Sequence, residues 1–115
     1  MATIAQTVVT GVKTPVVVTK TTLTSSDTFS YSAGTGQVLE LTNGTGGSLT
    51  VNIDGSGSTT IQPDGMGQTV DVSAGFNIVL TAGVTKAVPL DSIKVWLIGT
   101  IAVTGGTGIT ASITV

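Results

Sequence analysis

Residues 37–53 read QVLELTNGTGGSLTVNI, and apolar and polar side chains alternate there on both sides of a glycine-rich centre. The alternating apolar residues are Leu39, Leu41, Leu49, Val51 and Ile53. A period of two gives a strand one apolar face and one polar face. Asn and Gly supply the positive-φ positions that tight turns need. The stretch therefore predicts two β-strands joined by a compact turn over residues 43–47.

The same alternation continues in residues 70–72, 76–80 and 109–115, and Gly-rich turns separate these runs. Apolar residues with the 3.6-residue period of a helix do not recur anywhere in the chain. We expect about eight strands between residues 37 and 115, at the spacing typical of sandwiches and barrels. The pattern predicts an all-β, single-domain antiparallel β-sandwich, jelly-roll-like, or a barrel.

Residues 93–98 are apolar on both faces if they form a strand, since Ile93, Val95 and Leu97 alternate with Lys94, Trp96 and Ile98. We therefore expect a central strand or one under a subunit contact. Trp96 has two interpretations, an anchor in a core or interface and a platform that stacks on a sugar. Because only four residues of the chain are aromatic, a sugar platform would be thin. We favour the anchor and place Trp96 and Ile98 in a candidate interface.

Residues 1–36 are organised differently, because short apolar runs are separated there by polar stretches and by Pro15. We expect residues 1–36 to form an extended N-terminal arm and the first short strands, and residues 37–115 to form the β-sandwich domain. The alternative, that the arm simply supplies the first strands of the fold, stays open. An unpaired strand is suited to pairing with a neighbouring chain. The candidate contact residues of the arm are Ile4, Val8 and Val9.

The composition argues against enzymatic chemistry. Among 115 residues there is no Cys, His or Arg, whereas 23 are Thr, 10 are Ser and 16 are Gly. His is the usual acid–base catalyst at neutral pH, and Arg is the usual clamp for anionic groups. Without Cys, disulfide frameworks and Cys-based zinc sites are excluded. We expect a protein that is not an enzyme and that uses no cofactor.

Low charge excludes further partners. The net charge is −2 and only 9% of residues are charged, with the four Lys scattered along the chain. Nucleic-acid binding needs clustered Lys and Arg, so we expect no nucleic-acid partner. No run approaches the roughly 20 apolar residues of a membrane helix, and the N-terminus lacks the basic region of a signal peptide. We expect no membrane association.

A weak calcium-like pattern also occurs. Asp54-Gly55-Ser56-Gly57 could supply ligands together with Asp64 and Asp71. Calcium prefers about six to eight oxygens with several carboxylates close together. These acidic residues are dispersed, so we expect a Gly-rich hairpin turn and no metal site.

Five segments resemble, in the same order, small capsid decoration (cement) proteins of tailed bacteriophages. The segments are Gly36–Val51, Val70–Gly75, Ala87–Leu90, Gly99–Val103 and Ile109–Val115. In those proteins a hydrophobic strand ends at an Asn-rich turn, and a Thr-Val strand follows it. The resemblance covers roughly residues 36–115. Asn43 and Gly44, in that turn, complete the candidate interface.

The resemblance implies a virion protein that binds the outer surface of the expanded phage head and stabilises it against the pressure of packaged DNA. The implied partners are the major capsid protein and further copies of the chain, as a homodimer or homotrimer. The implied location is the outer surface of the capsid, after synthesis in the host cytoplasm. Two alternatives remain, another virion β-domain of a tail tube or fibre, and a carbohydrate-binding β-sandwich.

Overall fold

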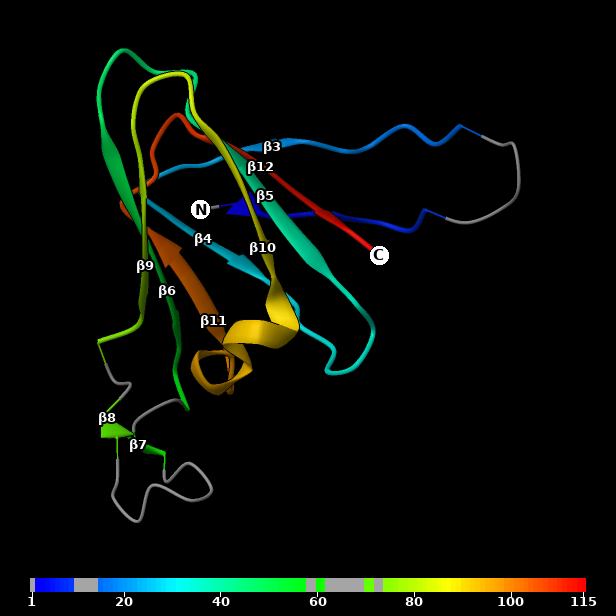
Figure 1. The fold of residues 1–115 in the computed structure, drawn as a ribbon, viewed down its shortest axis with the longest axis vertical. Coiled ribbons are helices and arrows are strands. Elements are labelled where there is room, and N and C mark those ends of the chain that lie inside the picture. Colours follow the sequence, from blue (N-terminus) through cyan, green and yellow to red (C-terminus); the bar gives the residue numbers. More distant parts are fainter. Residues whose placement is uncertain (1, 10–14, 58–59, 62–69, 72–73) are drawn as a thin grey trace.

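The computed structural model describes residues 2–9, 15–57, 60–61, 70–71 and 74–115. Within these residues the chain forms two five-stranded mixed sheets packed as a sandwich, a two-stranded sheet and one 3-10 helix, η1 (Figure 1). The predicted all-β sandwich is therefore confirmed. The sheets do not close into the barrel that was the alternative.

The first sheet, sheet A, contains in order β1 (Ala2–Thr3), β4 (Ser26–Phe29), β11 (Ile101–Thr104), β6 (Leu49–Gly55) and β9 (Phe76–Leu80). The second, sheet B, contains in order β10 (Thr85–Pro89), β5 (Val38–Thr42), β12 (Thr110–Thr114) and β2 (Gln6–Thr7), with β3 (Thr21–Thr22) also paired to β12. The short strands β7 (Thr60–Ile61) and β8 (Val70–Asp71) pair only with each other in the described part of the chain.

Consecutive strands mostly change sheet. The strands β3, β4, β5 and β6 lie alternately in sheets B and A, and β9 follows β6 within sheet A. The strands β10, β11 and β12 then lie in sheets B, A and B. Every pair among these eight strands is antiparallel. The two parallel pairs are β1 with β4 and β2 with β12. The prediction of purely antiparallel sheets is thus wrong for residues 2–7 and correct for these eight strands.

The core consists of the inward faces of both sheets, as the alternation predicted. Leu39 and Leu41 of β5 and Val51 and Ile53 of β6 are completely buried. Residues between them, such as Glu40, point to the outer surface. Burying such a side chain contributes about 1.5–3 kcal/mol, so this period-two pattern specifies which face of each strand is inside.

The segment predicted as a strand over residues 93–98 is instead part of η1 (Leu90–Trp96) and the turn after it. Pro89 ends β10, and the Ser92 hydroxyl donates to the Pro89 carbonyl at 2.6 Å, which closes the first turn. In a 3-10 helix, residues three apart share a face, so Leu90 and Ile93 both reach the core. The strand prediction failed because the apolar residues at 93, 95 and 97 also match a period of two.

Gly55 was expected in a turn but is the last residue of β6. The backbone of residues 96–98 passes directly over it, and a Cβ at Gly55 would lie 2.5 Å from the Ile98 carbonyl oxygen. A glycine is therefore required here because β6 and the end of η1 approach each other closely.

Candidate functional site

The N-terminal segment divides into two parts with different surroundings. Residues 2–7, the arm root, add β1 to sheet A and β2 to sheet B. The described residues 8–9 and 15–19, the outer arm, extend away from both sheets as two neighbouring legs (Figure 1). Ile4, predicted as a contact residue, belongs to the root and is only 3% exposed. Its side chain is part of the core and is not available to a partner.

Backbone and carboxylate hydrogen bonds fix the arm root. The Ile4 amide donates to the Thr28 carbonyl at 2.8 Å. The carboxylate of Asp27, which is completely buried, accepts hydrogen bonds from the Ala2 amide at 3.0 Å and from the Thr24 amide and hydroxyl, each at 2.8 Å. A buried carboxylate needs such donors because its desolvation is costly. Asp27 therefore ties the first strand to the turn that precedes β4.

Hydrogen bonds hold the described residues of the outer arm next to the arm root and the C-terminus. The Thr19 amide donates to the Thr7 hydroxyl at 3.0 Å and joins the two legs. The Val9 amide donates to the Val115 carbonyl at 2.9 Å, and the Val115 amide donates to the Thr7 carbonyl at 3.0 Å. Residues 8–9 and 15–17 are exposed.

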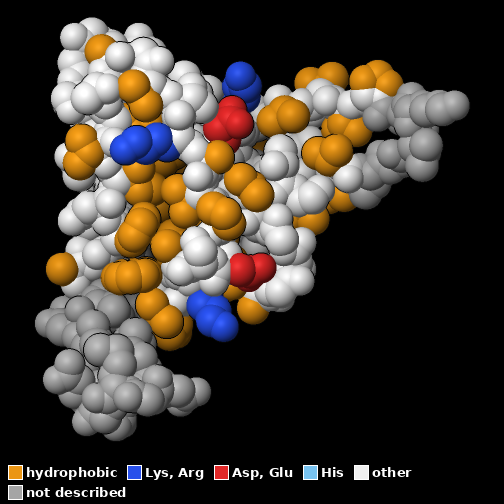
Figure 2. Space-filling view, viewed as in Figure 1, with side chains coloured by type: hydrophobic (Ala, Val, Ile, Leu, Met, Phe, Trp, Pro, Cys, Tyr) orange, Lys and Arg blue, Asp and Glu red, His pale blue; other side chains and the backbone are white. Residues whose placement is uncertain are grey.

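Apolar side chains cover the outer arm. The exposed fractions are 50% for Val8, 54% for Val9, 36% for Val16 and 89% for Val17. Figure 2 shows hydrophobic side chains along both legs of the projection. The sequence identified Val8 and Val9 but not Val16 and Val17. The sequence signal that could have found them is the run Val16–Val18 after Pro15, because no polar residue alternates with these three valines.

Trp96 and Ile98, the second predicted cluster, lie at the end of η1 and in the turn after it. Trp96 is partly buried, and its ring centroid lies 5.1 Å from that of Phe76 in a tilted arrangement. Ile98 is 49% exposed, and its carbonyl accepts a hydrogen bond from the Gly57 amide at 2.8 Å. Trp96 thus contacts the start of β9, whereas the Ile98 side chain reaches the surface.

Asn43, in the third predicted cluster, is completely buried and organises its turn. Its amide nitrogen donates to the carbonyls of Gly47 and Leu80, at 2.8 and 2.9 Å. Its amide oxygen accepts from the Thr45 amide and hydroxyl, at 3.0 and 2.6 Å. The side chain is therefore fully used inside the chain. Gly44 is exposed, so any contact at this turn would involve backbone and not the Asn43 side chain.

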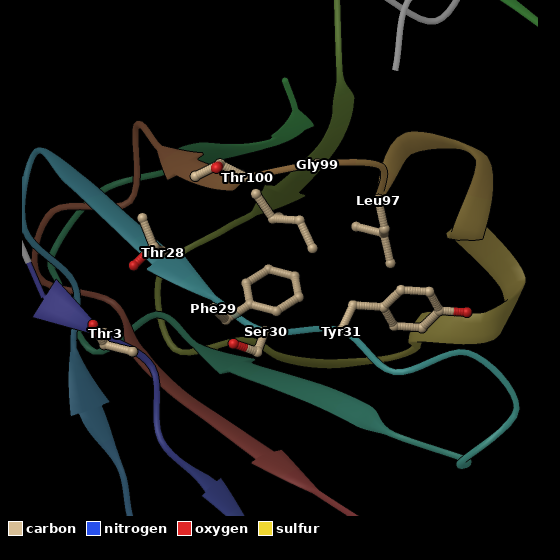
Figure 3. Close-up of a pocket in the computed structure, with 9 residues that line it drawn as sticks. Thr3, Thr28, Phe29, Ser30, Tyr31, Leu97, Gly99 and Thr100 are labelled. Carbon is tan, nitrogen blue, oxygen red and sulfur yellow. The ribbon is translucent and has the colours of Figure 1, made fainter. Parts of the chain in front are cut away.

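A surface hollow of about 630 Å³ lies where β4 ends and β11 begins. Phe29, Leu97 and Ile101 supply apolar walls, and hydroxyls of Thr3, Thr28, Ser30 and Thr100 lie around them. Figure 3 shows the Tyr31 hydroxyl directed away from this space, toward η1. These three apolar side chains are only 3–6% exposed, so the accessible groups of the hollow are mainly those of its hydroxyl rim, and no carboxylate or amine is among its lining residues.

Tyr31 joins the loop after β4 to η1. Its hydroxyl donates to Asp91 Oδ1 at 2.5 Å, and the Gly34 amide donates to the same oxygen at 3.0 Å. The hydrogen bond to Asp91, followed by partial burial, raises the pKa of Tyr31. The hydrogen bonds from Tyr31 and then from Gly34 lower the pKa of Asp91. Both shifts favour the pair in which Tyr31 is neutral and Asp91 is ionised.

Two further observations concern ligands. Among the described residues, no three Asp or Glu side chains lie close enough together to hold a metal ion. Of the calcium-like pattern, Asp64 lies outside the described residues, and nothing is described for the side chain of Asp71. The only helix described, η1, is far too short to cross a membrane.

No family model, curated protein or solved structure gives a significant match to this chain. The resemblance to phage decoration proteins therefore stays a prediction.

Proposed function

We propose that this chain is a viral structural protein, a capsid decoration or cement protein that binds the outer surface of a phage head and stabilises it against internal DNA pressure. The observation that carries the proposal is the outer arm. It places Val8, Val9, Val16 and Val17 in solvent on a protein whose surface is otherwise rich in hydroxyls. Exposed apolar side chains grouped on a projection are typical of interaction sites.

The strand order supports the proposal. The orders β3-β12-β5-β10 and β4-β11-β6-β9, with most consecutive strands changing sheet, support a jelly-roll-like arrangement within the sandwich. Jelly rolls occur in viral capsid domains, and also in lectins and cupins. Because one fold hosts many functions, the order alone does not select among them. We base the virion proposal on this order together with the outer arm and the resemblance of residues 36–115.

The chemistry of the surface fits a protein partner. With four Lys and six acidic residues, the surface offers little for long-range attraction to nucleic acid or to an anionic membrane. Binding through valines and backbone groups is little weakened by salt. A subunit repeated over a symmetric shell also gains avidity from simultaneous contacts. The partners we propose are the major capsid protein and further copies of this chain, on the outside of the virion, after synthesis in the host cytoplasm.

Co-sedimentation with phage heads tests the proposal. The purified protein should pellet with expanded heads, should pellet less with unexpanded heads, and should raise the temperature at which expanded heads release DNA. Binding should persist when ionic strength rises from about 0.1 M to about 1 M. Absence from the pellet of expanded heads under all these conditions would refute the proposal. Protein that is present in virions at only a few copies would indicate a tail or fibre component.

A carbohydrate-binding module is the second candidate, and the hollow beside Phe29 is the observation that favours it. The Thr and Ser hydroxyls on its rim could hydrogen-bond a sugar. A glycan array separates the two functions. Specific glycan binding that is lost in Ser30→Ala, at an exposed rim hydroxyl, and kept in Val17→Ser would favour the module over the capsid protein.

A further inference from the structure

The sandwich has two free sheet edges on one side, and they differ in chemistry. β9 is the last strand of sheet A and β10 is the first strand of sheet B, and within the described residues neither has a partner on its outer edge. β10 reads TKAVP and carries Lys86 and Pro89. β9 reads FNIVL and carries neither a charge nor a proline. Charges and prolines are the usual means by which edge strands avoid pairing with other chains. β10 is protected in this way, and β9 is not.

Apolar surface accompanies the unprotected edge. Val79 lies on the outer face of β9 and is 50% exposed. Phe76 begins the strand and is only partly buried, as is Trp96, which packs against it. Figure 2 shows a band of hydrophobic side chains on the side of the molecule where β9 and β10 lie. The Leu80 carbonyl already accepts a hydrogen bond from Asn43, so the free edge runs from Phe76 to Val79.

We infer that β9 pairs antiparallel with β9 of a second copy, so that sheet A continues through a two-fold dimer. The absence of charged residues in β9 favours a second copy of the same strand as its partner. A two-fold axis pairs identical strands antiparallel, so a charged residue at or next to the axis would lie close to its own counterpart. β9 contains no charge, whereas self-pairing of β10 would bring two Lys86 side chains together. With the axis at Ile78, Asn77 of one copy lies opposite Val79 of the other, and both are on the outer face.

Light scattering and sedimentation equilibrium at micromolar concentrations test the pairing without any phage head. The native chain should be a dimer. Val79→Lys places a charge on the exposed outer face of the edge and should raise the dimer dissociation constant about tenfold or more. Ala87→Lys is the matched control, because it adds the same charge to an exposed position of β10 and should leave the constant unchanged. Circular dichroism checks that both variants are folded.

Hydrogen exchange of the native chain is a second test of the β9 pairing, and it needs no variant. Those amides of residues 76–79 that point away from β6 should gain protection as concentration rises, whereas those of residues 85–88 should not. The inference would be overturned if the native chain stayed a monomer over a roughly 100-fold range of concentration, or if it formed a trimer. Equal effects of Val79→Lys and Ala87→Lys on the dissociation constant would also overturn it. Protection of β9 that appears only after heads are added would also overturn it and would assign this edge to a capsid strand.

Discussion

The arm root, ATIAQT, and the outer arm, VV and PVVVT, belong to one N-terminal segment, yet only the root is part of the fold. In the root, Ile4 is 3% exposed and its backbone is bonded to β4. In the outer arm, Val9 is 54% and Val17 is 89% exposed. Because the outer arm is the more apolar part and is nevertheless exposed, the free edges of β4 and β12, and not local hydrophobicity, decide where the N-terminal segment becomes part of the sandwich. The outer arm begins where those edges end.

A substitution in the arm root should therefore lower the free energy of unfolding far more than a substitution in the outer arm. We expect Ile4→Ala to lower the free energy of unfolding by about 2–4 kcal/mol, because it leaves a cavity in the core. Val8→Ala should change it by less than about 0.5 kcal/mol, since Val8 is half exposed. Urea unfolding measures both. Equal effects of the two changes would mean that the root is not an integral part of the sheets.

The second largest effect should come from Asp27. Asp27→Ala removes the acceptor of three hydrogen bonds and leaves the Ala2 and Thr24 donors without it. We expect a loss of about 2 kcal/mol, and faster exchange of the Ala2 and Thr24 amides. Glu40→Ala, at an exposed carboxylate, is the control and should be nearly neutral. If the two variants unfold at the same urea concentration, Asp27 does not fasten the root.

A smaller effect is expected at the junction of root and outer arm. Thr7→Val removes the hydroxyl that accepts from the Thr19 amide. We expect a loss of about 1 kcal/mol or less, together with faster exchange of the Thr19 amide. Unchanged exchange at Thr19 would show that this contact does not hold the legs together.

Tyr31 provides a comparison with the arm, because its loop is fastened to η1 by a side-chain pair. As the only tyrosine of the chain, it can be titrated by its ultraviolet absorbance. The midpoint should lie above 10.0 and should return toward 10.0 in Asp91→Asn, which removes the ionised acceptor. A midpoint that Asp91→Asn does not lower would show that the pair is not formed in solution.

The same pair sets a weak dependence of stability on pH. A raised folded-state pKa of Tyr31 contributes stability below pH 10.0 that is lost as pH rises through the folded value. A lowered folded-state pKa of Asp91 contributes stability above pH 3.8 that is lost as pH falls through the folded value. Both groups lie near the surface, so these losses should be the smallest of the series.

The sequence predicted the strands whose side chains alternate cleanly, such as β5, β6, β9 and β12, because one buried face imposes that pattern. It did not predict η1, because Ile93, Val95 and Leu97 follow the period of two of a strand, while Leu90, Ile93 and Trp96 follow the spacing of three of a 3-10 helix. Nor did it predict the parallel pairing of β1 and β2, since pairing direction depends on contacts distant in sequence. Asn43 was misassigned to a surface because a turn Asn can bind solvent or, as here, four groups of its own chain.

The most direct test of the central claim is the binding of heads by a variant with Val8→Ser, Val9→Ser and Val17→Ser. The matched control is a triple variant with Ala33→Ser, Ala82→Ser and Ala87→Ser, since it introduces the same three hydroxyls at exposed positions of the body. The outer arm should bind the head, so the triple valine variant should keep the native melting temperature and lose most co-sedimentation with expanded heads, while the control keeps both. Undiminished binding by the folded triple variant would contradict the claim.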